Sequence, residues 1–225
     1  MSVPLILAIE TATHQCTVAL GRDGAVLAQR SSGAAKQAHA SSVNVFVDEV
    51  MREAGHALEE LNAVAVGIGP GSYTGLRIGL SAAKGLCQAL DIPIIGISTL
   101  SALARAAGSS AAVQWPMIDA RRMEVFAQRH LANGKPEGEV SAIILDEAWT
   151  KGQGVITVYG DGADKAVDLW KACANVEHLP GITPHAHYLL SMAEERLRAG
   201  LVDDLAYLVP AYGKEANVTQ PGRRA

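Results

Sequence analysis

Apolar residues near the start of the chain fall into three short runs, at residues 5–10, 17–21 and 26–32. Each run has the length of a strand. Turn-forming residues follow the first two runs, Thr11-Ala12-Thr13-His14 after the first and Arg22-Asp23-Gly24 after the second. The pattern predicts an antiparallel meander of three strands.

A helical period follows the meander. Apolar side chains recur at i, i+3, i+4, i+7, i+8 and i+11, the spacing of one helix face; they are Val43, Phe46, Val47, Val50, Met51 and Ala54. The chain then alternates between strands predicted at residues 63–68 and 94–97 and helices predicted at residues 76–90 and 100–107. A strand–helix–strand crossover pairs its strands in parallel, so these elements predict a mixed sheet with helices packed on it.

The pattern restarts after a small, polar stretch at residues 106–110. Strands are predicted at residues 113–118, 124–130, 143–145 and 155–159, a Gly-Lys-Pro turn at 134–136, and helices at 163–174 and 185–199. The two halves are similar, and each begins with a meander. We therefore predict two subdomains, residues 1–107 and 108–225, each a mixed sheet flanked by helices, with the last segment packing back onto the first subdomain.

Composition narrows the class of protein. Of the 225 residues, 49% are hydrophobic and 19% charged, which is the balance of a globular chain, and no apolar run approaches the roughly 18 residues of a membrane span. Lys and Arg number 19 against 23 Asp and Glu, and this net charge of −4 argues against a strongly basic RNA-binding body. Three distant cysteines (Cys16, Cys87 and Cys173) show no metal-binding spacing and indicate the reduced thiols of a cytoplasmic protein.

The segment between the strand at 63–68 and the helix at 76–90 is rich in glycine. Its candidate site residues are Gly69, Gly71, Ser72, Thr74 and Gly75, with Ser72 or Thr74 as the helix N-cap. Such a turn either binds an anion at the free N–H groups of the helix start or lets two backbones pack closely. Neither nucleotide motif is present, because the third glycine comes one residue late for G-x-G-x-x-G and no lysine follows Gly75 as in a P-loop.

The helix at 76–90 is apolar on two faces. One row is Leu76, Leu80, Ala83, Leu86/Cys87 and Leu90, and a second row of mostly small residues is Ile78, Ala82, Gly85 and Ala89. The sheet covers one row, and small residues let another helix approach the second row closely. That helix is either the one at 43–54 of the same chain or a helix of another subunit. In the second case the predicted partner interface comprises Val43, Phe46, Val47, Val50, Ile78, Ala82, Gly85 and Ala89.

Four segments of the chain resemble the TsaB (YeaZ) family. They are Leu-Ile-Leu-Ala-Ile-Glu-Thr-Ala-Thr at 5–13, Gly-Ile-Gly-Pro-Gly-Ser-Tyr-Thr-Gly-Leu-Arg-Ile-Gly at 67–79, Pro-Ile-Ile-Gly-Ile-Ser-Thr-Leu at 93–100 and Ile-Asp-Ala-Arg at 118–121. The resemblance extends from residue 5 to about residue 212, and the 67–79 block is its most specific part. It implies a duplicated actin/Hsp70-like (ASKHA) α/β fold. It also implies a role in making threonylcarbamoyladenosine beside the anticodon of tRNAs that read codons beginning with A.

The same resemblance implies a set of partners. TsaB is the companion of a catalytic paralogue, TsaD, with which it forms a heterodimer, and it works with the ATPase TsaE through that complex. Alone it forms a homodimer through the surface that TsaD also uses, and it meets tRNA indirectly through the complex. We therefore expect a cytoplasmic partner protein without a cofactor and without a membrane partner.

Positions at which TsaD carries catalytic groups hold other residues in this chain. Aligned through Pro93, the two metal-binding histidines of TsaD fall on Thr99 and Leu103, and the acid of its first hairpin falls on His14. No set of three or four ligands stands at metal spacing, so we expect neither a metal site nor catalysis. The alternative is an autonomous ATP-binding enzyme of the sugar-kinase type, because the fold permits one. A metalloprotease is disfavoured, because the sequence has no H-E-x-x-H motif.

Asp119 and Arg121 also match the family. They are either an active motif or a turn between two strands that a local ion pair stabilises by about 0–1 kcal/mol. The basic residues that we consider for contacts with tRNA phosphates are Arg121, Arg122, Lys214, Arg223 and Arg224. Given the net charge of −4, we expect them to form an auxiliary patch at best.

Overall fold

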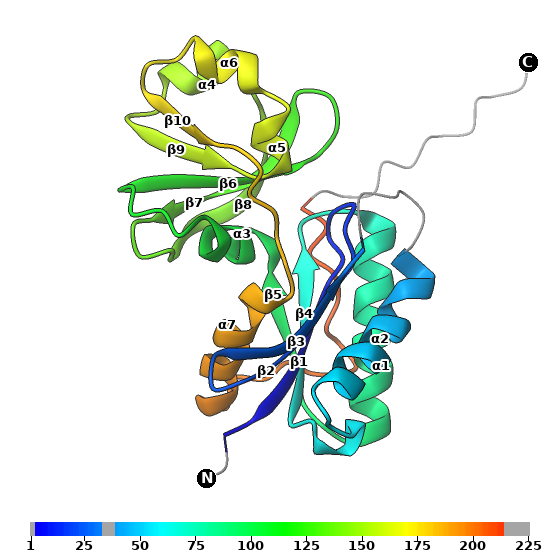
Figure 1. Cartoon of the computed structure of the whole chain (residues 1–225). Coiled ribbons are helices and arrows are strands. Elements are labelled where there is room, and N and C mark those ends of the chain that lie inside the picture. The colour runs from blue at the N-terminus through cyan, green and yellow to red at the C-terminus, as the bar shows by residue number, and fades with distance from the viewer. Residues whose placement is uncertain (1–2, 33–38, 214–225) are drawn as a thin grey trace, which may run out of the picture.

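The structure is a computed structural model that describes residues 3–32 and 39–213. The chain forms two lobes, each built on a five-stranded sheet, which lie one above the other in Figure 1. We call the lobe that contains β1–β5 the first lobe and the lobe that contains β6–β10 the second lobe. Within the described residues, no helix is long and apolar enough to cross a membrane.

The first sheet has the strand order β3-β2-β1-β4-β5. Its strands are β1 (Leu5–Glu10), β2 (Thr17–Arg22), β3 (Ala25–Ser31), β4 (Ala63–Gly69) and β5 (Ile94–Ser98). β1 pairs antiparallel with β2 and parallel with β4, β2 pairs antiparallel with β3, and β4 pairs parallel with β5. The predicted meander and the predicted parallel strands are thus confirmed.

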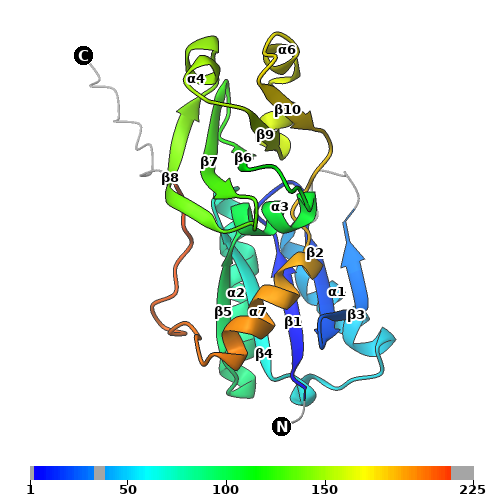
Figure 2. The ribbon, with the colours of Figure 1, turned by 90° about the vertical axis from the view of Figure 1, so that its left-hand side faces the viewer.

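Helices cover both faces of the first sheet. They are α1 (His39–Glu53), the 3-10 helix η1 (Leu58–Glu60), α2 (Tyr73–Leu90) and α7 (His187–Arg198). α1 and α2 lie side by side on one face, and α7 lies on the other (Figures 1 and 2). Leu7 packs into the core beneath α1 and α2, whereas its neighbours Ile6 and Ala8 face α7. Because both faces are covered, every residue of β1 is buried.

The second sheet repeats this topology, with the order β8-β7-β6-β9-β10. Its strands are β6 (Val113–Asp119), β7 (Glu124–Leu131), β8 (Pro136–Ile144), β9 (Ile156–Tyr159) and β10 (Val176–Leu179). β6 pairs antiparallel with β7 and parallel with β9, as β1 does with β2 and β4. The repeat confirms the predicted α/β class and the duplicated actin/Hsp70-like arrangement of two mixed sheets flanked by helices.

Several elements of the second lobe differ from the prediction. The helix predicted at 163–174 is two short helices, α5 (Asp161–Asp164) and α6 (Val167–Lys171), and α4 (Glu147–Lys151) and β10 were not predicted. β8 begins at Pro136, whereas the sequence predicted a strand only from residue 143. The prediction missed the start of β8 because its first residues are exposed and mainly polar and show no apolar alternation. All of these elements are short or lie at a sheet edge, where the hydrophobic period is weak.

The two lobes meet through α3 (Thr99–Ala107). Leu100 and Leu103 of α3 are fully buried and form one apolar cluster with Ile118, Phe126 and Tyr159 of the second lobe. α3 therefore follows the last strand of the first sheet in the chain but packs on the second sheet. This cluster joins the lobes by a hydrophobic core rather than by a flexible linker.

The chain returns along the first lobe after α7. We call residues 199–213 the strap. Its Asp203 forms a β-bridge with Ile94 of β5, and the Ala211 N–H donates to the Ile68 carbonyl at 2.7 Å. At its end, Gly213 lies against the Phe126 ring of the second lobe, where a Cβ would come within 2.8 Å of a ring carbon. The strap thus packs along the first lobe and reaches the second lobe at its last residue, while the boundary between residues 107 and 108 stays a prediction.

Candidate functional site

The second face of α2 is partly buried and partly exposed, and its role as a partner interface stays a prediction. Ile78 and Ala82 are half-buried, whereas Gly85 and Ala89 are exposed. A Cβ placed on Gly85 would meet nothing within 4 Å. The opposite row, which includes Leu80, Ala83 and Cys87, is buried against the first sheet. One helix therefore supports the core with one face and presents small residues with the other.

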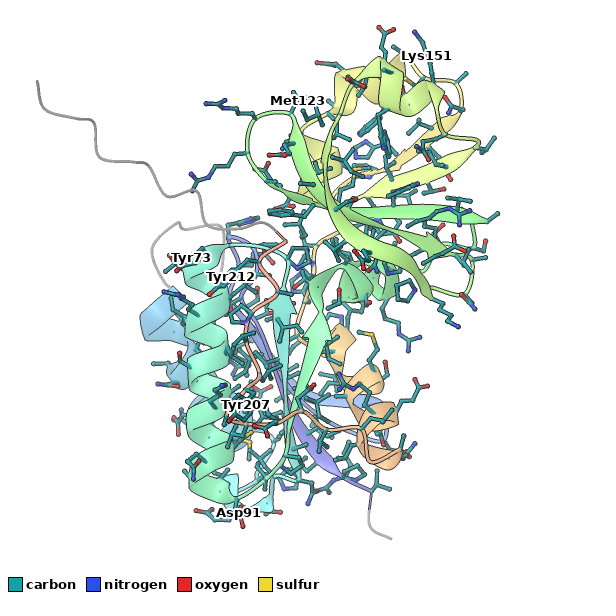
Figure 3. All side chains as sticks on the ribbon, turned by 180° about the vertical axis from the view of Figure 1, so that it is seen from behind. Tyr73, Asp91, Met123, Lys151, Tyr207 and Tyr212 are labelled. Carbon is teal, nitrogen blue, oxygen red and sulfur yellow. The ribbon has the colours of Figure 1, made fainter. Side chains whose placement is uncertain are left out.

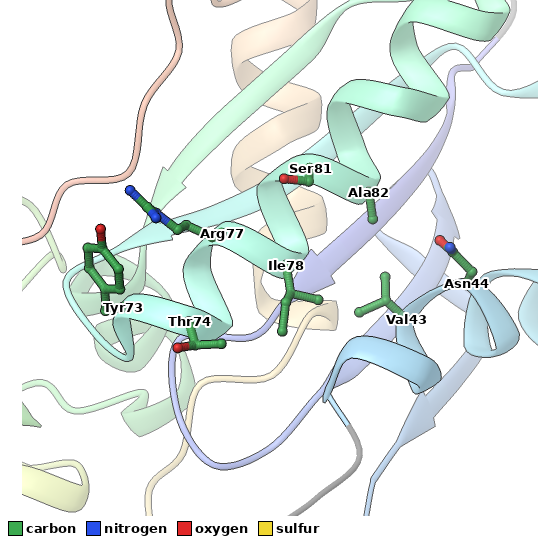
Figure 4. Close-up of a pocket in the computed structure, with 8 residues that line it drawn as sticks. All are labelled: Val43, Asn44, Tyr73, Thr74, Arg77, Ile78, Ser81 and Ala82. Carbon is green, nitrogen blue, oxygen red and sulfur yellow. The ribbon is translucent and has the colours of Figure 1, made fainter.

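A groove runs between α1 and α2 beside this face. Near the start of α2 it forms a cavity of about 570 Å³, lined by Val43, Asn44, Tyr73, Thr74, Arg77, Ile78, Ser81 and Ala82 (Figure 4). Ile78 and Ala82 point from α2 toward Val43 and Asn44 of α1 in this view. A second cavity of about 550 Å³ follows it between α1 and Leu86. The two helices thus form a grooved surface that extends along much of α2.

The prediction for α1 needs a correction. Val43, Val47 and Val50 are 1%, 4% and 0% exposed and belong to the core of the first lobe, and Phe46 is half-buried against the same core. These side chains form the apolar stripe by which α1 packs on the sheet. They therefore contribute only to the floor of the groove. The outward positions of α1 are mainly polar and include Asn44, Asp48 and Arg52 together with the exposed Val45.

The glycine-rich turn after β4 packs against the loop that follows β1. A Cβ on Gly71 would overlap the Ala12 carbonyl oxygen, and one on Gly75 would overlap the Thr11 carbonyl oxygen. Gly69 has a φ of +108°, and a Cβ there would lie 2.6 Å from the Ala211 carbonyl oxygen of the strap. These glycines permit three backbones to meet at one point, which supports the close-packing alternative.

The N–H groups of the turn are partly used inside the protein. The Ser72 N–H donates to the Ala12 carbonyl at 2.7 Å, the Gly75 N–H donates to Ser72 Oγ at 3.2 Å, and the Leu76 N–H donates to the Ser72 carbonyl at 2.9 Å. Ser72 is therefore the N-cap, and Thr74 lies exposed in the first turn of α2. The anion-binding alternative has few donors left at this turn.

Glu10 at the end of β1 is a buried acid that the sequence analysis did not single out. Its carboxylate accepts from the Ala12 N–H at 2.7 Å and from the Thr99 hydroxyl at 3.3 Å, and it occupies the space over Gly67 that a Cβ would need. Burial raises the pKa of Glu10 to about 7, and the hydrogen bonds from Ala12 and Thr99 only partly oppose this effect. The signal in the sequence was a charged residue that closes an otherwise apolar strand.

The positions aligned with the catalytic groups of TsaD do not form a metal site. Thr99 and Leu103 are fully buried, Thr99 beside Glu10 and Leu103 in the cluster between the lobes, and His14 is exposed. Among the described residues, no group of three or more His, Cys, Asp and Glu side chains is placed to hold a metal ion. In these contacts Thr99 and Leu103 serve packing.

Asp119 and Arg121 lie in the hairpin between β6 and β7. Asp119 accepts from the Arg121 N–H at 2.8 Å and forms an ion pair with Lys165, while its own N–H donates to Asp161 at 2.9 Å. Burial raises the pKa of Asp161 above its ordinary value. The local ion pair of the turn is thus made by Lys165, and Arg121 contributes its backbone. Lys214, Arg223 and Arg224 lie outside the described residues.

Sequence comparison relates the chain to proteins of tRNA modification. A family model described as TsaD, tRNA N6-adenosine threonylcarbamoyltransferase, matches residues 31–212. The tRNA threonylcarbamoyladenosine biosynthesis protein TsaB of Haemophilus influenzae is 30% identical over 202 residues, with 84% of each chain covered. The protein of the same name from Escherichia coli is 38% identical over 144 residues, and the match spans 62% of the length of each chain.

Structural comparison agrees with the sequence. A crystal structure from Pseudomonas aeruginosa, described as an uncharacterized protein with similarity to peptidase YEAZ, superposes with a TM-score of 0.80 at 28% identity. The superposition covers 95% of this chain and all of that one. A superposition of this extent includes both lobes.

Proposed function

This chain belongs to the TsaB (YeaZ) family, and from that premise we propose that it is the non-catalytic companion of TsaD in tRNA modification. In this role it supports transfer of the threonylcarbamoyl group to the adenosine next to the anticodon in tRNAs that read codons beginning with A. It forms a heterodimer with TsaD, meets TsaE through that complex, and pairs with a second copy of itself when alone. It needs no cofactor of its own and works in the cytoplasm.

The exposed small-residue face of α2 is the observation that carries the proposal. Ala82, Gly85 and Ala89 lie along one side of an 18-residue helix, next to the groove with α1. Small side chains let the backbone of a second helix come close, so a helix pair from a partner would complete a four-helix bundle with α1 and α2. A monomer has no evident use for such a face, because helix surfaces that meet only water are usually polar.

The residues that replace the TsaD catalytic groups support a non-catalytic role. Thr99 and Leu103 cannot supply imidazole ligands, and Leu103 is committed to the apolar cluster that joins α3 to the second lobe. An enzyme of the sugar-kinase type would need an acid at the phosphate side of the cleft. His14 stands at that position in this chain.

The substitution Ala82→Arg tests the interface. Residue 82 is half-buried, and an arginine can lie along the groove with its charge in water, so we expect the stability of the monomer to change by about 0.5 kcal/mol or less. At a close helix contact the same side chain adds bulk and an unpaired charge, so binding of TsaD should weaken by several kcal/mol. Co-purification with TsaD measures the second effect and urea unfolding the first.

The matched control is Ala148→Arg. Ala148 is an exposed helical residue in α4 of the second lobe, so this change adds the same charge away from α2. We expect Ala148→Arg to retain TsaD binding and full tRNA modification in the reconstituted system. Equal TsaD binding by both variants would place the interface elsewhere, and threonylcarbamoyladenosine formed by this chain alone would contradict the non-catalytic role.

A further inference from the structure

The strap brings residues of both lobes together at the start of α2. Tyr212 of the strap stacks on Tyr73 of α2, with ring centroids 4.8 Å apart. The next residue, Gly213, lies against Phe126 of β7 in the second lobe. The start of α2 and the start of β7 therefore lie at the two ends of a single short contact through the strap.

Arg77 is held at this junction in a fixed orientation. Its Nε donates to the Tyr212 hydroxyl at 2.9 Å, and its guanidinium carbon lies 4.2 Å from the centroid of the Tyr73 ring. The side chain is nevertheless exposed to solvent. A planar guanidinium fixed in this way presents two parallel N–H groups, the arrangement that binds a phosphate through two hydrogen bonds.

Two further arginines project from the hairpin between β6 and β7. Arg121 has a φ of +73° and Arg122 a φ of +51°, a left-handed backbone that Gly, Asn and Asp adopt far more readily than Arg. The Asp119–Lys165 pair and the Arg121 N–H bond to Asp119 fix the turn. Both arginine side chains are exposed, and neither forms an ion pair with any residue in the ranges 3–32 and 39–213.

The hairpin and Arg77 lie on the same part of the molecule. Phe126, which touches Gly213, is the third residue of β7, and the turn that carries Arg121 and Arg122 directly precedes this strand. Figure 3 shows the hairpin that carries Met123 above Tyr73 and Tyr212. Three exposed arginines thus lie around one junction of a chain whose net charge is −4.

We propose that Arg77, Arg121 and Arg122 form a contact surface for the phosphate backbone of RNA. The inference rests on the proposed function, which provides a tRNA substrate, and goes beyond it, because there tRNA meets this chain only through the complex. Phosphates repeat along every strand of an RNA, so three arginines carried by two elements can meet more than one phosphate. Such contacts position an RNA without reading its sequence, which suits a companion protein that leaves chemistry to its partner.

Because the hairpin has a left-handed backbone at Arg121 and Arg122, both charges can be removed without destabilising the protein. The double variant Arg121→Asn/Arg122→Gly removes both charges and installs residues that the left-handed backbone favours, so its melting temperature should be no lower than that of the wild type. The control Arg105→Gln/Lys135→Gln removes two exposed positive charges from the groove between α3 and β8. Each variant is reconstituted with TsaD and TsaE, and affinity for an unmodified transcript of a tRNA reading A-starting codons is measured between 50 and 200 mM salt.

We expect the hairpin variant to bind this transcript about tenfold more weakly at 0.15 M salt and the slope of log affinity against log salt to fall by about 1.5, as for two lost phosphate contacts. The control should retain most of the slope. A hairpin variant with the slope and affinity of the control would overturn the inference, and so would loss of its TsaD binding, because the surface would then belong to a protein contact. Wild-type protein that fails to bind TsaD would instead refute the proposed function on which the inference rests.

Discussion

The two lobes carry the same turn after the fourth strand of each, and they use it differently. β4 runs into Gly69-Pro70-Gly71 and β9 into Gly160-Asp161-Gly162, and the first glycines have φ values of +108° and +103°. The second glycine of each turn lies against the end of the first strand of its own lobe, near Ala12 and Ile118 respectively. The duplication thus extends from strand order to single backbone torsions.

The acids at the ends of β1 and β6 show a second correspondence. Glu10 accepts from the N–H two residues later at 2.7 Å, and Asp119 does the same at 2.8 Å. Glu10 is buried and forms no ion pair with any other described residue, whereas the side chain of Asp119 is 44% exposed and pairs with Lys165. The same local hydrogen bond therefore lies in two electrostatic environments, and in the first lobe burial raises the pKa of Glu10 to about 7.

The helices that follow the two turns explain why the first lobe suits assembly. α2 continues for 18 residues, whereas α5 ends after four. A long helix can bury one face on its own sheet and still present a continuous second face, and a helix of one turn cannot. The same type of turn thus starts a long helix with a second, partly exposed face in one lobe and a single helical turn in the other.

Placing a methyl group on both turns should give the largest effect. In Gly69→Ala and Gly160→Ala, the new alanine must adopt a φ above +100°. Its Cβ must also displace a backbone carbonyl, that of Ala211 at residue 69 and that of Met117 at residue 160. We expect each variant to lose about 3 kcal/mol or more of unfolding free energy. Urea unfolding followed by far-ultraviolet circular dichroism measures this loss.

Gly55→Ala separates torsional strain from overlap at these turns. Gly55 has a φ of +71°, but a Cβ there would meet nothing within 4 Å, so only about 1 kcal/mol should be lost. If Gly160→Ala is no more destabilising than Gly55→Ala, the backbone contact in the second lobe is loose. The correspondence between the two turns would then be one of torsion alone.

Replacing the two acids, Glu10 and Asp119, should have different effects on how the free energy of unfolding depends on pH. The folded-state pKa of Glu10, about 7, lies above the ordinary value of 4.5, so the folded protein holds this proton more tightly than the unfolded chain. The free energy of unfolding should therefore fall as the pH rises from about 4.5 to 7, and this loss is complete above pH 7. Glu10→Gln should abolish the fall and stabilise the protein above pH 7 by up to about 3 kcal/mol.

Asp119→Asn is the counterpart in the second lobe. It removes an ion pair with Lys165 at a partly exposed site, so we expect a loss within about 1 kcal/mol that shrinks as salt is added. Thermal melts of both variants from pH 5 to 8.5 make the comparison. A Glu10→Gln variant with the same pH profile as the wild type would show that Glu10 stays ionised in the folded protein.

The sequence predicts the first lobe better than the second for a physical reason. Helices of 15 and 18 residues show several turns of apolar period, which a pattern can detect. α4, α5 and α6 have four or five residues each, so none completes two turns, and their boundaries are set by tertiary contacts such as the Trp170 hydrogen bond to the Ala163 carbonyl. The duplicated topology was nevertheless predictable, because it depends on the order of the apolar runs.

The candidate site was predictable only in part. The second row on α2 could be identified because it has the same helical spacing as the core row but is offset from it by two residues. α1 has only one apolar stripe, and the sheet buries that stripe. The close contact of Gly75 with Thr11 joins residues 64 apart, and the burial of Glu10 depends on Gly67 and Thr99. Such contacts arise from the fold, so no local pattern announces them.

The smallest change, one methyl group on the outer face of α2, sharpens the comparison most. Gly85→Ala adds a Cβ in open space within a helix, so the monomer should gain about 0.5–1 kcal/mol of stability. If a partner helix packs closely at residue 85, the same methyl group should weaken association with TsaD by about 1–2 kcal/mol, roughly tenfold. Gly154→Ala, which also adds a Cβ in open space but lies in the second lobe, should leave association unchanged. A more stable monomer that assembles less well is an outcome that a purely structural glycine cannot give, because a face exposed to water gains from alanine without loss. Unchanged association with the stabilised variant would mean that the partner leaves room at residue 85, and the close approach would then have to be sought at Ala82.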